Sequence, residues 1–291
     1  MVQGTASTAW LTTDPSARIP LSSELKGSME PTVDDLLCFG ALLPWIIHVV
    51  AAVLDSFIGP TEIGDTVTQH DSRATALVVV AHHRADSLTA HTARRTAARL
   101  EAAGYRVDLL DLHAEGFDPR MNVADQPDWG DREKRYSDEV HAHMQRLLDA
   151  DAVVAVFPVY WQSVPAILKG WIDRVWNYGF AYGRSKPRLA GKRILWLGLA
   201  GAAADDPVVE GMQTVLETNL SEGIAYYCGF SRSTVGLLTD AEERPQRVDA
   251  EGNLLVGDAV TGAEREAQYA AFDRRAREFV EKFVAEEVVA A

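Results

Sequence analysis

Three side chains able to hold a planar ligand stand together in one short loop. Tyr160, Trp161 and Gln162 follow a wholly apolar, mostly β-branched run, residues 153–157, and precede a helical pattern that starts at Pro165. The spacing of core residues does not explain Trp161, which favours a role facing a ligand. Aromatic faces stack on flat conjugated rings. The loop therefore predicts a ledge for a planar cofactor.

The elements on either side of this loop can be predicted from their patterns. Residues 153–157 have the composition of a strand covered on both faces, which is typical of parallel sheets, and Pro158 ends that strand. Pro165 has a fixed φ and no N–H, which suits the start of a helix. Trp171 and Trp176 follow at helical spacing and are expected in the core. Open α/β sheets bind ligands at the carboxyl ends of their strands, where this loop lies.

A second strand-to-helix turn carries polar groups suited to an anion. Residues 76–81 form an apolar run, and a helix is expected to follow and to extend to about Ala103. Asp86 or Ser87 is the expected N-cap, and the free N–H groups at the start of such a helix attract phosphate. Arg84 either adds charge to this pocket or is solvated. His82 has no partner at the spacing of metal ligands, so no metal site is predicted.

The remaining patterns complete a doubly wound sheet. An apolar strand at 193–199 is followed by small residues, 200–204, which allow close backbone approach and can offer N–H groups to the polar edge of a flat ring. Further strands are expected at 105–112 and 223–230, helices at 136–148, 207–221 and around 269–283, and a small hairpin around 251–253. Five strands alternating with helices predict an α/β fold with the flavodoxin-like strand order 2-1-3-4-5.

One long segment resembles a known family. Residues 157–182 read FPVYWQSVPAILKGWIDRVWNYGFAY, which looks like the hallmark of the NAD(P)H:quinone oxidoreductase (DT-diaphorase) family of flavodoxin-like flavoproteins. A second similarity, GI-x-x-x-CGF, lies at 223–230. The resemblance extends from about residue 74 to the C-terminus.

The resemblance implies a function and a set of site residues. It implies a flavin, FAD or FMN, that accepts a hydride from NAD(P)H and passes two electrons to a quinone or a related electrophile. Trp161 would stack at the slot that the two substrates share. Tyr182 would reach into the site of a neighbouring subunit, which implies a homodimer. The cofactor-binding positions of the family map onto His82, Ser87, Leu88, Thr89, Pro158, Val159, Tyr160, Trp161, Gln162, Gly198, Leu199, Ala200 and Gly201.

Two departures from the family pattern concern the chemistry. The family usually has a Thr-Thr-Gly-Gly turn where this chain has the residues 198–201, so two hydroxyl groups are lost. In animal members a Tyr and a His relay charge during hydride transfer, and the corresponding positions here are Ala204 and Glu210. The resemblance therefore supplies no relay residues for this chain.

Composition narrows the classes of partner and the compartment. The chain has 291 residues and a formal net charge of −14, with no basic stripe, which argues against nucleic-acid binding. Cys38 and Cys228 are its only cysteines, which favours a reducing cytoplasm. Cys228 is expected to be a small buried apolar side chain.

Residues 1–73 are predicted to be an extension of the domain at 74–291, with 1–35 largely disordered. Residues 36–54 contain no Asp, Glu, Lys or Arg and are long enough to span a bilayer, but their flanks and Pro44 favour a helix that covers an apolar surface. A later natural start is also open. Two alternative functions remain: a flavin reductase of azo, nitro or natural-product acceptors, and an ancillary regulatory subunit of a glutathione-gated potassium efflux system.

Overall fold

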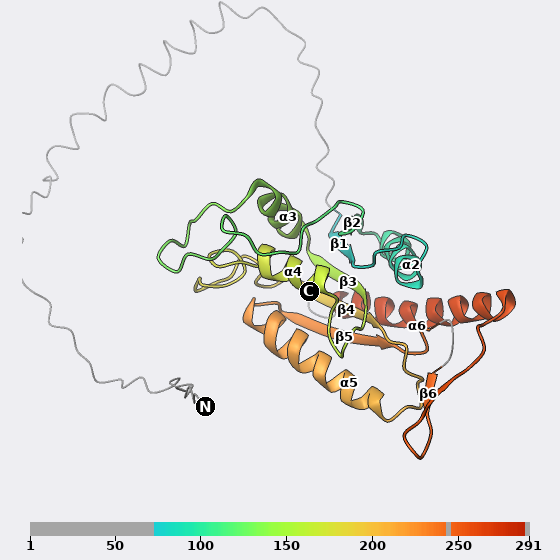
Figure 1. Cartoon of the computed structure of the whole chain (residues 1–291). Coiled ribbons are helices and arrows are strands. Elements are labelled where there is room, and N and C mark those ends of the chain that lie inside the picture. The colour runs from blue at the N-terminus through green and yellow to red at the C-terminus, as the bar shows by residue number, and fades with distance from the viewer. Residues whose placement is uncertain (1–72, 243–245, 289–291) are drawn as a thin grey trace, which may run out of the picture. The chain divides into compact units, whose positions relative to one another are not determined.

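A five-stranded parallel sheet forms the centre of the fold (Figure 1). The computed structural model describes residues 73–242 and 246–288. The sheet has the order β2-β1-β3-β4-β5, as predicted from the alternation of strands and helices. Its strands are β1 (Thr75–Val80), β2 (Arg106–Asp111), β3 (Ala152–Pro158), β4 (Arg193–Leu199) and β5 (Arg232–Leu238).

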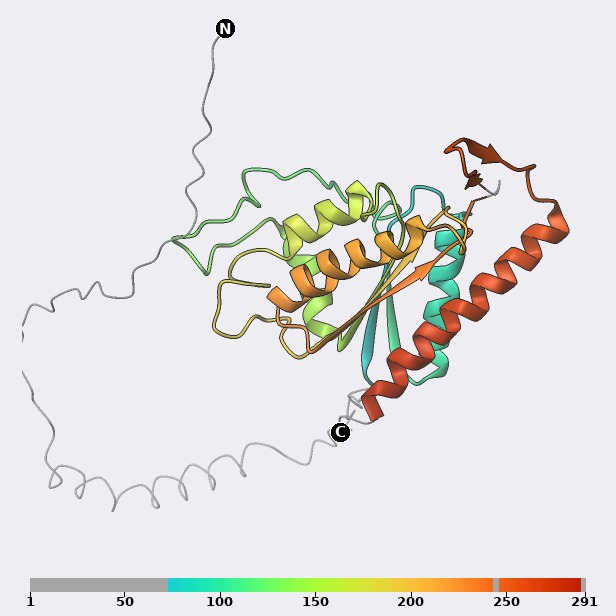
Figure 2. The same cartoon turned by 90° about the horizontal axis from the view of Figure 1, so that it is seen from below.

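Helices cover both faces of this sheet (Figures 1 and 2). They are α2 (Leu88–Ala102), α3 (Asp138–Asp149), α4 (Ala166–Val175), α5 (Val208–Leu216), the π-helix η2 (Glu217–Ala225) and α6 (Gly262–Val288). Alternate strand residues point to opposite layers, because successive side chains of a strand leave opposite faces. Val78 and Val154 pack with α2 and α6, whereas Leu77 and Val153 pack with α3 and α4.

The register of the strands brings three turns together. Val80 at the end of β1 is level with Val156 of β3, and Pro158 at the end of β3 is level with Leu199 of β4. The segments that follow these strands therefore emerge side by side at one edge of the sheet. This is the edge at which open parallel sheets bind ligands.

The core on the α4 side is rich in tryptophan. Trp171 and Trp176 are buried, as their spacing predicted, and their rings lie 5.8 Å apart. Trp176 also lies 5.9 Å from Trp196 of β4 and stacks on Phe230 at 5.4 Å. These contacts hold α4 firmly against the sheet, directly after the aromatic loop.

The strand predicted at residues 223–230 is wrong. The chain there continues from α5 into η2, and the fifth strand begins only at Arg232. A strand would place Tyr226 and Cys228 on the same face. In the structure Tyr226 is 80% exposed and Cys228 is buried, with Ala225 and Cys228 three residues apart facing the sheet. Burial raises the pKa of the Cys228 thiol to about 12, consistent with the predicted inert, apolar role.

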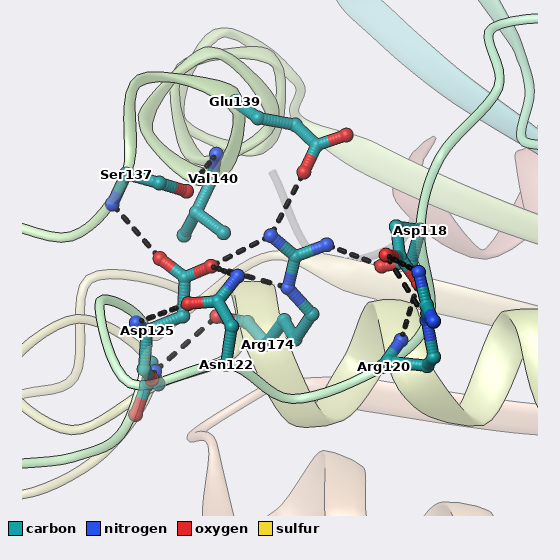
Figure 3. Close-up of polar contacts among 9 residues, drawn as sticks. Asp118, Arg120, Asn122, Asp125, Ser137, Glu139, Val140 and Arg174 are labelled. Atoms are coloured by element: carbon teal, nitrogen blue, oxygen red, sulfur yellow. Dashed lines mark hydrogen bonds and ion pairs between the residues drawn. The ribbon is translucent and has the colours of Figure 1, made fainter.

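A buried ion pair fixes the long segment between β2 and α3 (Figure 3). The Arg174 guanidinium of α4 donates to Asp125 at 2.6 Å and to Glu139 at 2.8 Å. Asp125 is fully buried and also accepts the Ser137 N–H at 2.8 Å. The segment is therefore tied to the body of the domain at its middle and at its end.

The remaining predictions concern the ends of the domain. The hairpin consists of β6 (Gln246–Val248) and β7 (Leu254–Val256), and α6 packs on the sheet through Phe272 and Phe283. None of the described helices is long and apolar enough to cross a membrane. Cys38 and residues 36–54 lie outside the described residues, and the boundary at 73/74 stays a prediction.

Candidate functional site

A cavity of about 490 Å³ opens where β1, β3 and β4 end. Its volume lies in the range usual for cofactor and ligand sites. The lining residues come from the turn after β1, the loop after β3, the end of β4, the segment after β5 and the start of α6. They are His82, Arg84, Asp86, Ser87, Leu88, Thr89, Pro158, Val159, Tyr160, Leu199, Gly201, Ala241, Glu242, Arg265, Gln268 and Tyr269.

The start of α2 presents free backbone donors to this cavity. Ser87 is the N-cap, as predicted, and its hydroxyl oxygen accepts the Ala90 N–H at 3.1 Å. In the described part of the chain, the N–H groups of Leu88 and Thr89 donate to no acceptor. Unpaired N–H groups and the helix dipole together favour a negatively charged ligand. This turn is therefore built to receive a phosphate group.

His82 lies beside this helix start as a neutral donor. Its Nδ1 accepts the Arg84 N–H at 3.0 Å, which assigns the ring proton to Nε2. Burial, and next the His83 ring stacked on it at 4.6 Å, hold the pKa of His82 below its ordinary value. A neutral imidazole with its N–H on Nε2 can donate to a phosphate oxygen.

Arg84 lines the cavity and is also paired. Its Nε and Nη2 donate to the Asp86 carboxylate at 3.0 Å and 2.9 Å, and both side chains are largely exposed. A bidentate pair of this kind orients the guanidinium. Arg84 was expected either to add charge to the pocket or to be solvated. In the structure its side chain lines the cavity, is largely exposed to solvent and is paired with Asp86.

The aromatic loop after β3 is a two-residue turn in an unusual conformation. Tyr160 and Ser163 exchange two backbone hydrogen bonds, each of 3.0 Å. Between them Trp161 and Gln162 have φ values of 51° and 57°, the signature of a type I′ turn, which strongly prefers Asn and Gly. Non-glycine residues held at positive φ cost free energy and cluster at functional sites.

The side chains of this turn differ in whether they line the cavity. Tyr160 lines the cavity, whereas Trp161 and Gln162 do not. The Trp161 side chain is 100% exposed and thus lies outside the core, as its position outside the helical pattern suggested. The turn therefore holds an uncovered indole next to the cavity at the expense of backbone strain.

The end of β4 contributes two of the four predicted residues to the cavity lining. Leu199 and Gly201 line it, and the Gly201 N–H donates to no acceptor among the described residues. The Ala200 N–H is taken by the Leu238 carbonyl oxygen at 2.8 Å. A Cβ on Gly198 would lie 2.9 Å from Cγ2 of Val159, so Gly198 serves the packing of the loop after β3.

The contribution of α6 to the cavity was not predicted from the sequence. Arg265, Gln268 and Tyr269 line the far side of the cavity. The Gln268 amide donates to the carbonyl oxygens of Asp240 and Glu242 at 2.8 Å and 3.1 Å, and thereby ties α6 to the segment after β5. These residues lie at i, i+3 and i+4, so they share one polar face of the helix. That spacing was a signal available in the sequence.

Tyr182 lies outside the cavity lining. Its half-buried ring sits within 5.7–6.1 Å of the rings of Tyr227, Tyr178 and Trp129. Burial raises the pKa of Tyr182, so its phenol stays protonated at neutral pH. Ala204 and Glu210, the positions of the family's relay, line a separate cavity beside α5.

Comparisons with known proteins agree with this fold. The family model described as the flavodoxin-like fold matches residues 74–254. A protein of Escherichia coli (strain K12) named "Uncharacterized NAD(P)H oxidoreductase YcaK" is 42% identical over 153 residues, which cover 53% of this chain and 76% of that protein. The rat NAD(P)H dehydrogenase [quinone] 1 is 31% identical over 177 residues, covering 53% of this chain and 65% of the rat protein.

A solved structure shows the same fold at lower identity. An NAD(P)H:quinone oxidoreductase from Methanothermobacter marburgensis has a TM-score of 0.57 and 22% identity, covering 71% of this chain and 96% of its own. The chain belongs to the flavodoxin-like family. The relatives confirm the narrower resemblance seen in residues 157–182, to the NAD(P)H:quinone oxidoreductases.

Proposed function

We propose that this protein is a flavin-dependent oxidoreductase that transfers two electrons from NAD(P)H to a quinone or a related electrophile. The observation that carries the proposal is the convergence of three strand ends on one cavity with unpaired N–H groups at a helix start. Its relatives named NAD(P)H oxidoreductase and NAD(P)H dehydrogenase [quinone] support the reaction class.

The residues present fit a flavin. The N–H groups of Leu88 and Thr89, with Ser87 and His82, would hold phosphate oxygens at the start of α2. Tyr160 would lie along the ring system, beside the loop after β3. When bound, the flavin supplies the hydride-accepting and electron-donating chemistry, and the protein supplies binding and orientation.

FAD is the form that we propose. The cavity does not end at the helix start but continues to α6, where Tyr269 offers an aromatic face and Gln268 and Arg265 offer polar groups. An adenosine moiety attached beyond the phosphate needs such a second, partly aromatic wall, whereas FMN ends at the phosphate. The Tyr269 ring is itself braced by His91 at 4.8 Å.

We further propose that Trp161 and Tyr182 complete the slot for NAD(P)H and acceptor. An exposed indole beside the cavity is able to stack on a nicotinamide or quinone ring. Tyr182 would contribute from the second subunit of a homodimer, as the resemblance implies. If both substrates use one slot in turn, the kinetics follow a ping-pong scheme.

The test is spectroscopic. The purified full-length chain is examined for a flavin absorption band, then treated with NADPH without oxygen, and then with a simple benzoquinone. The proposal expects the band to bleach with NADPH and to return with the quinone. A protein that takes up neither FAD nor FMN would contradict the proposed function.

A further inference from the structure

A second cavity, of about 210 Å³, lies between α3 and the loop that follows α4. It shares no residue with the cavity described above. Its wall is formed by the segment before α3, one face of α3 and the segment 178–188. Its lining residues include Arg132, Lys134, Arg184, Arg188, Met144 and Phe180.

The rim of this second cavity is strongly cationic in a chain whose net charge is −14. Arg132, Lys134, Arg184 and Arg188 line it, with Glu133 as the single carboxylate. Glu133 is paired with Arg184 at 2.6 Å. Since Glu133 neutralises one of the four cations, the rim keeps a surplus of positive charge.

Two of these cations keep their charge available for a ligand. Among the described residues, Arg132 and Arg188 form no ion pair. Lys134 is partly engaged, because its ammonium donates to the Gln126 carbonyl oxygen at 2.6 Å and lies 5.7 Å from the centre of the Tyr136 ring. An unpaired guanidinium offers a planar fork of donors that matches a carboxylate.

Beside the polar His141 and Gln145 of α3, the lining of this cavity includes apolar side chains. Met144 and Phe180 are buried there, and Leu148 lies one turn further along the same face of α3 as Met144. The hydroxyl of Tyr136 donates to the Tyr178 carbonyl oxygen at 2.7 Å. Because the hydroxyl is already engaged, the ring is the part of this side chain that can contact a ligand. Burial raises the pKa of Tyr136 to about 12, which keeps this donor protonated.

The two loops that carry the cationic rim are locked together. Gly179 has φ of 79°, and a Cβ at this position would lie 2.0 Å from the Arg132 carbonyl oxygen. The Arg184 guanidinium donates to the Gly179 carbonyl oxygen. Only glycine permits this approach, so the cavity results from a defined contact between the loops.

We propose that this cavity binds a small aromatic carboxylate. The apolar side chains of the lining pack on a flat hydrocarbon ring, and the guanidinium groups of Arg132 and Arg188 pair with its carboxylate. Neither an inorganic anion nor a neutral ring uses both features. The proposal concerns a second ligand site and does not depend on the redox function of the first cavity.

The test uses benzoate as the probe and isothermal titration calorimetry on the full-length protein, with its first cavity filled by added FAD. Saturable binding is expected for the unmodified chain. Arg188→Gln should weaken benzoate binding about tenfold, because a charge-assisted hydrogen bond is lost. Arg188 is exposed, so the variant should fold, which an unchanged thermal melt checks.

The matched control is Lys186→Gln, which removes one positive charge from the same exposed loop but not from the cavity lining. It should leave benzoate affinity unchanged. Equal weakening by the two variants, or no saturable binding, would overturn the proposal. Equal affinity for inorganic phosphate would show that charge alone governs binding, and equal affinity for benzyl alcohol would show that the carboxylate is not recognised; either result would overturn it.

Discussion

At the scale of single residues, the free donors at the start of α2 are the feature most directly readable from sequence. A polar turn after an apolar run predicted the N-cap, and Ser87 is that N-cap. The type I′ conformation of Trp161 and Gln162 was not predictable, because neither residue prefers positive φ. The two backbone hydrogen bonds between Tyr160 and Ser163 close the turn in that conformation, and local propensity does not reveal it.

Trp161→Ala is expected to weaken flavin retention or turnover while leaving the fold intact. The side chain is fully exposed, so the free energy of unfolding should change by no more than about 0.5 kcal/mol. Trp171→Ala removes a fully buried ring and should cost about 3–5 kcal/mol. Thermal melts of both variants make the comparison. Equal destabilisation would contradict the distinction.

His82 should make the stability of the flavin-free protein sensitive to acid. Because its folded pKa is lowered, the unfolded chain binds the proton more readily, and stability falls as the pH drops below the ordinary pKa of 6.5. His143, also buried with a lowered pKa, adds to the same loss. Melting temperatures measured from pH 8 to pH 5 test this. His82→Gln should reduce the fall in melting temperature between pH 8 and pH 5. An unchanged dependence of melting temperature on pH would exclude His82 as a contributor.

At the scale of elements, the strands near the centre were predictable and the last part of the sheet was not. β1, β3 and β4 are continuous apolar runs, which have few alternative interpretations. The segment 223–230 is also largely apolar, but it contains the end of η2 and the helical turn that follows, and Tyr226 and Tyr227 are exposed there. The role of α6 was missed because the helix was expected only around 269–283, whereas it begins at Gly262 and so includes Arg265 and Gln268.

The α6 contribution distinguishes the two flavin forms. Tyr269→Ala should weaken the binding of FAD by about tenfold, as expected for the loss of one stacked aromatic ring, and leave FMN affinity unchanged. Fluorescence titration of flavin-free protein measures both constants. Tyr269→Phe is the control and should retain FAD affinity. If Tyr269→Ala weakened the affinities for FMN and FAD equally, Tyr269 would not contact the adenosine.

The ion pairs of Arg174 with Asp125 and Glu139 are expected to stabilise the segment before α3. Arg174→Met removes a cation that is 2% exposed and leaves the buried Asp125 carboxylate unpaired. Breaking a buried pair on one side costs about 3–5 kcal/mol. Chemical denaturation should show this loss. The double variant Arg174→Met, Asp125→Leu should recover part of it, and a double variant no more stable than the single one would argue against the uncompensated charge as the cause.

At the scale of the whole molecule, the proposed homodimer makes a prediction about Tyr182. Its ring belongs to an aromatic group with Trp129, Tyr178 and Tyr227, of which Trp129 and Tyr227 are more than 60% exposed. Tyr182→Ala should lower turnover without unfolding, whereas Tyr182→Phe should keep the ring contacts. Steady-state kinetics and analytical ultracentrifugation provide the measurements. Kinetic constants equal to those of the unmodified protein would exclude a shared site.

The spread of the first cavity along the chain has a consequence for biosynthesis. Its residues run from His82 to Tyr269, and α6 covers one face of the sheet through Phe272 and Phe283. A ribosome releases the chain from its N-terminus at about 5–20 residues per second. Nearly the whole domain must therefore be synthesised before a cofactor can bind. A nascent chain that stops before α6 exposes the apolar strand faces, and these are the surfaces that chaperones recognise.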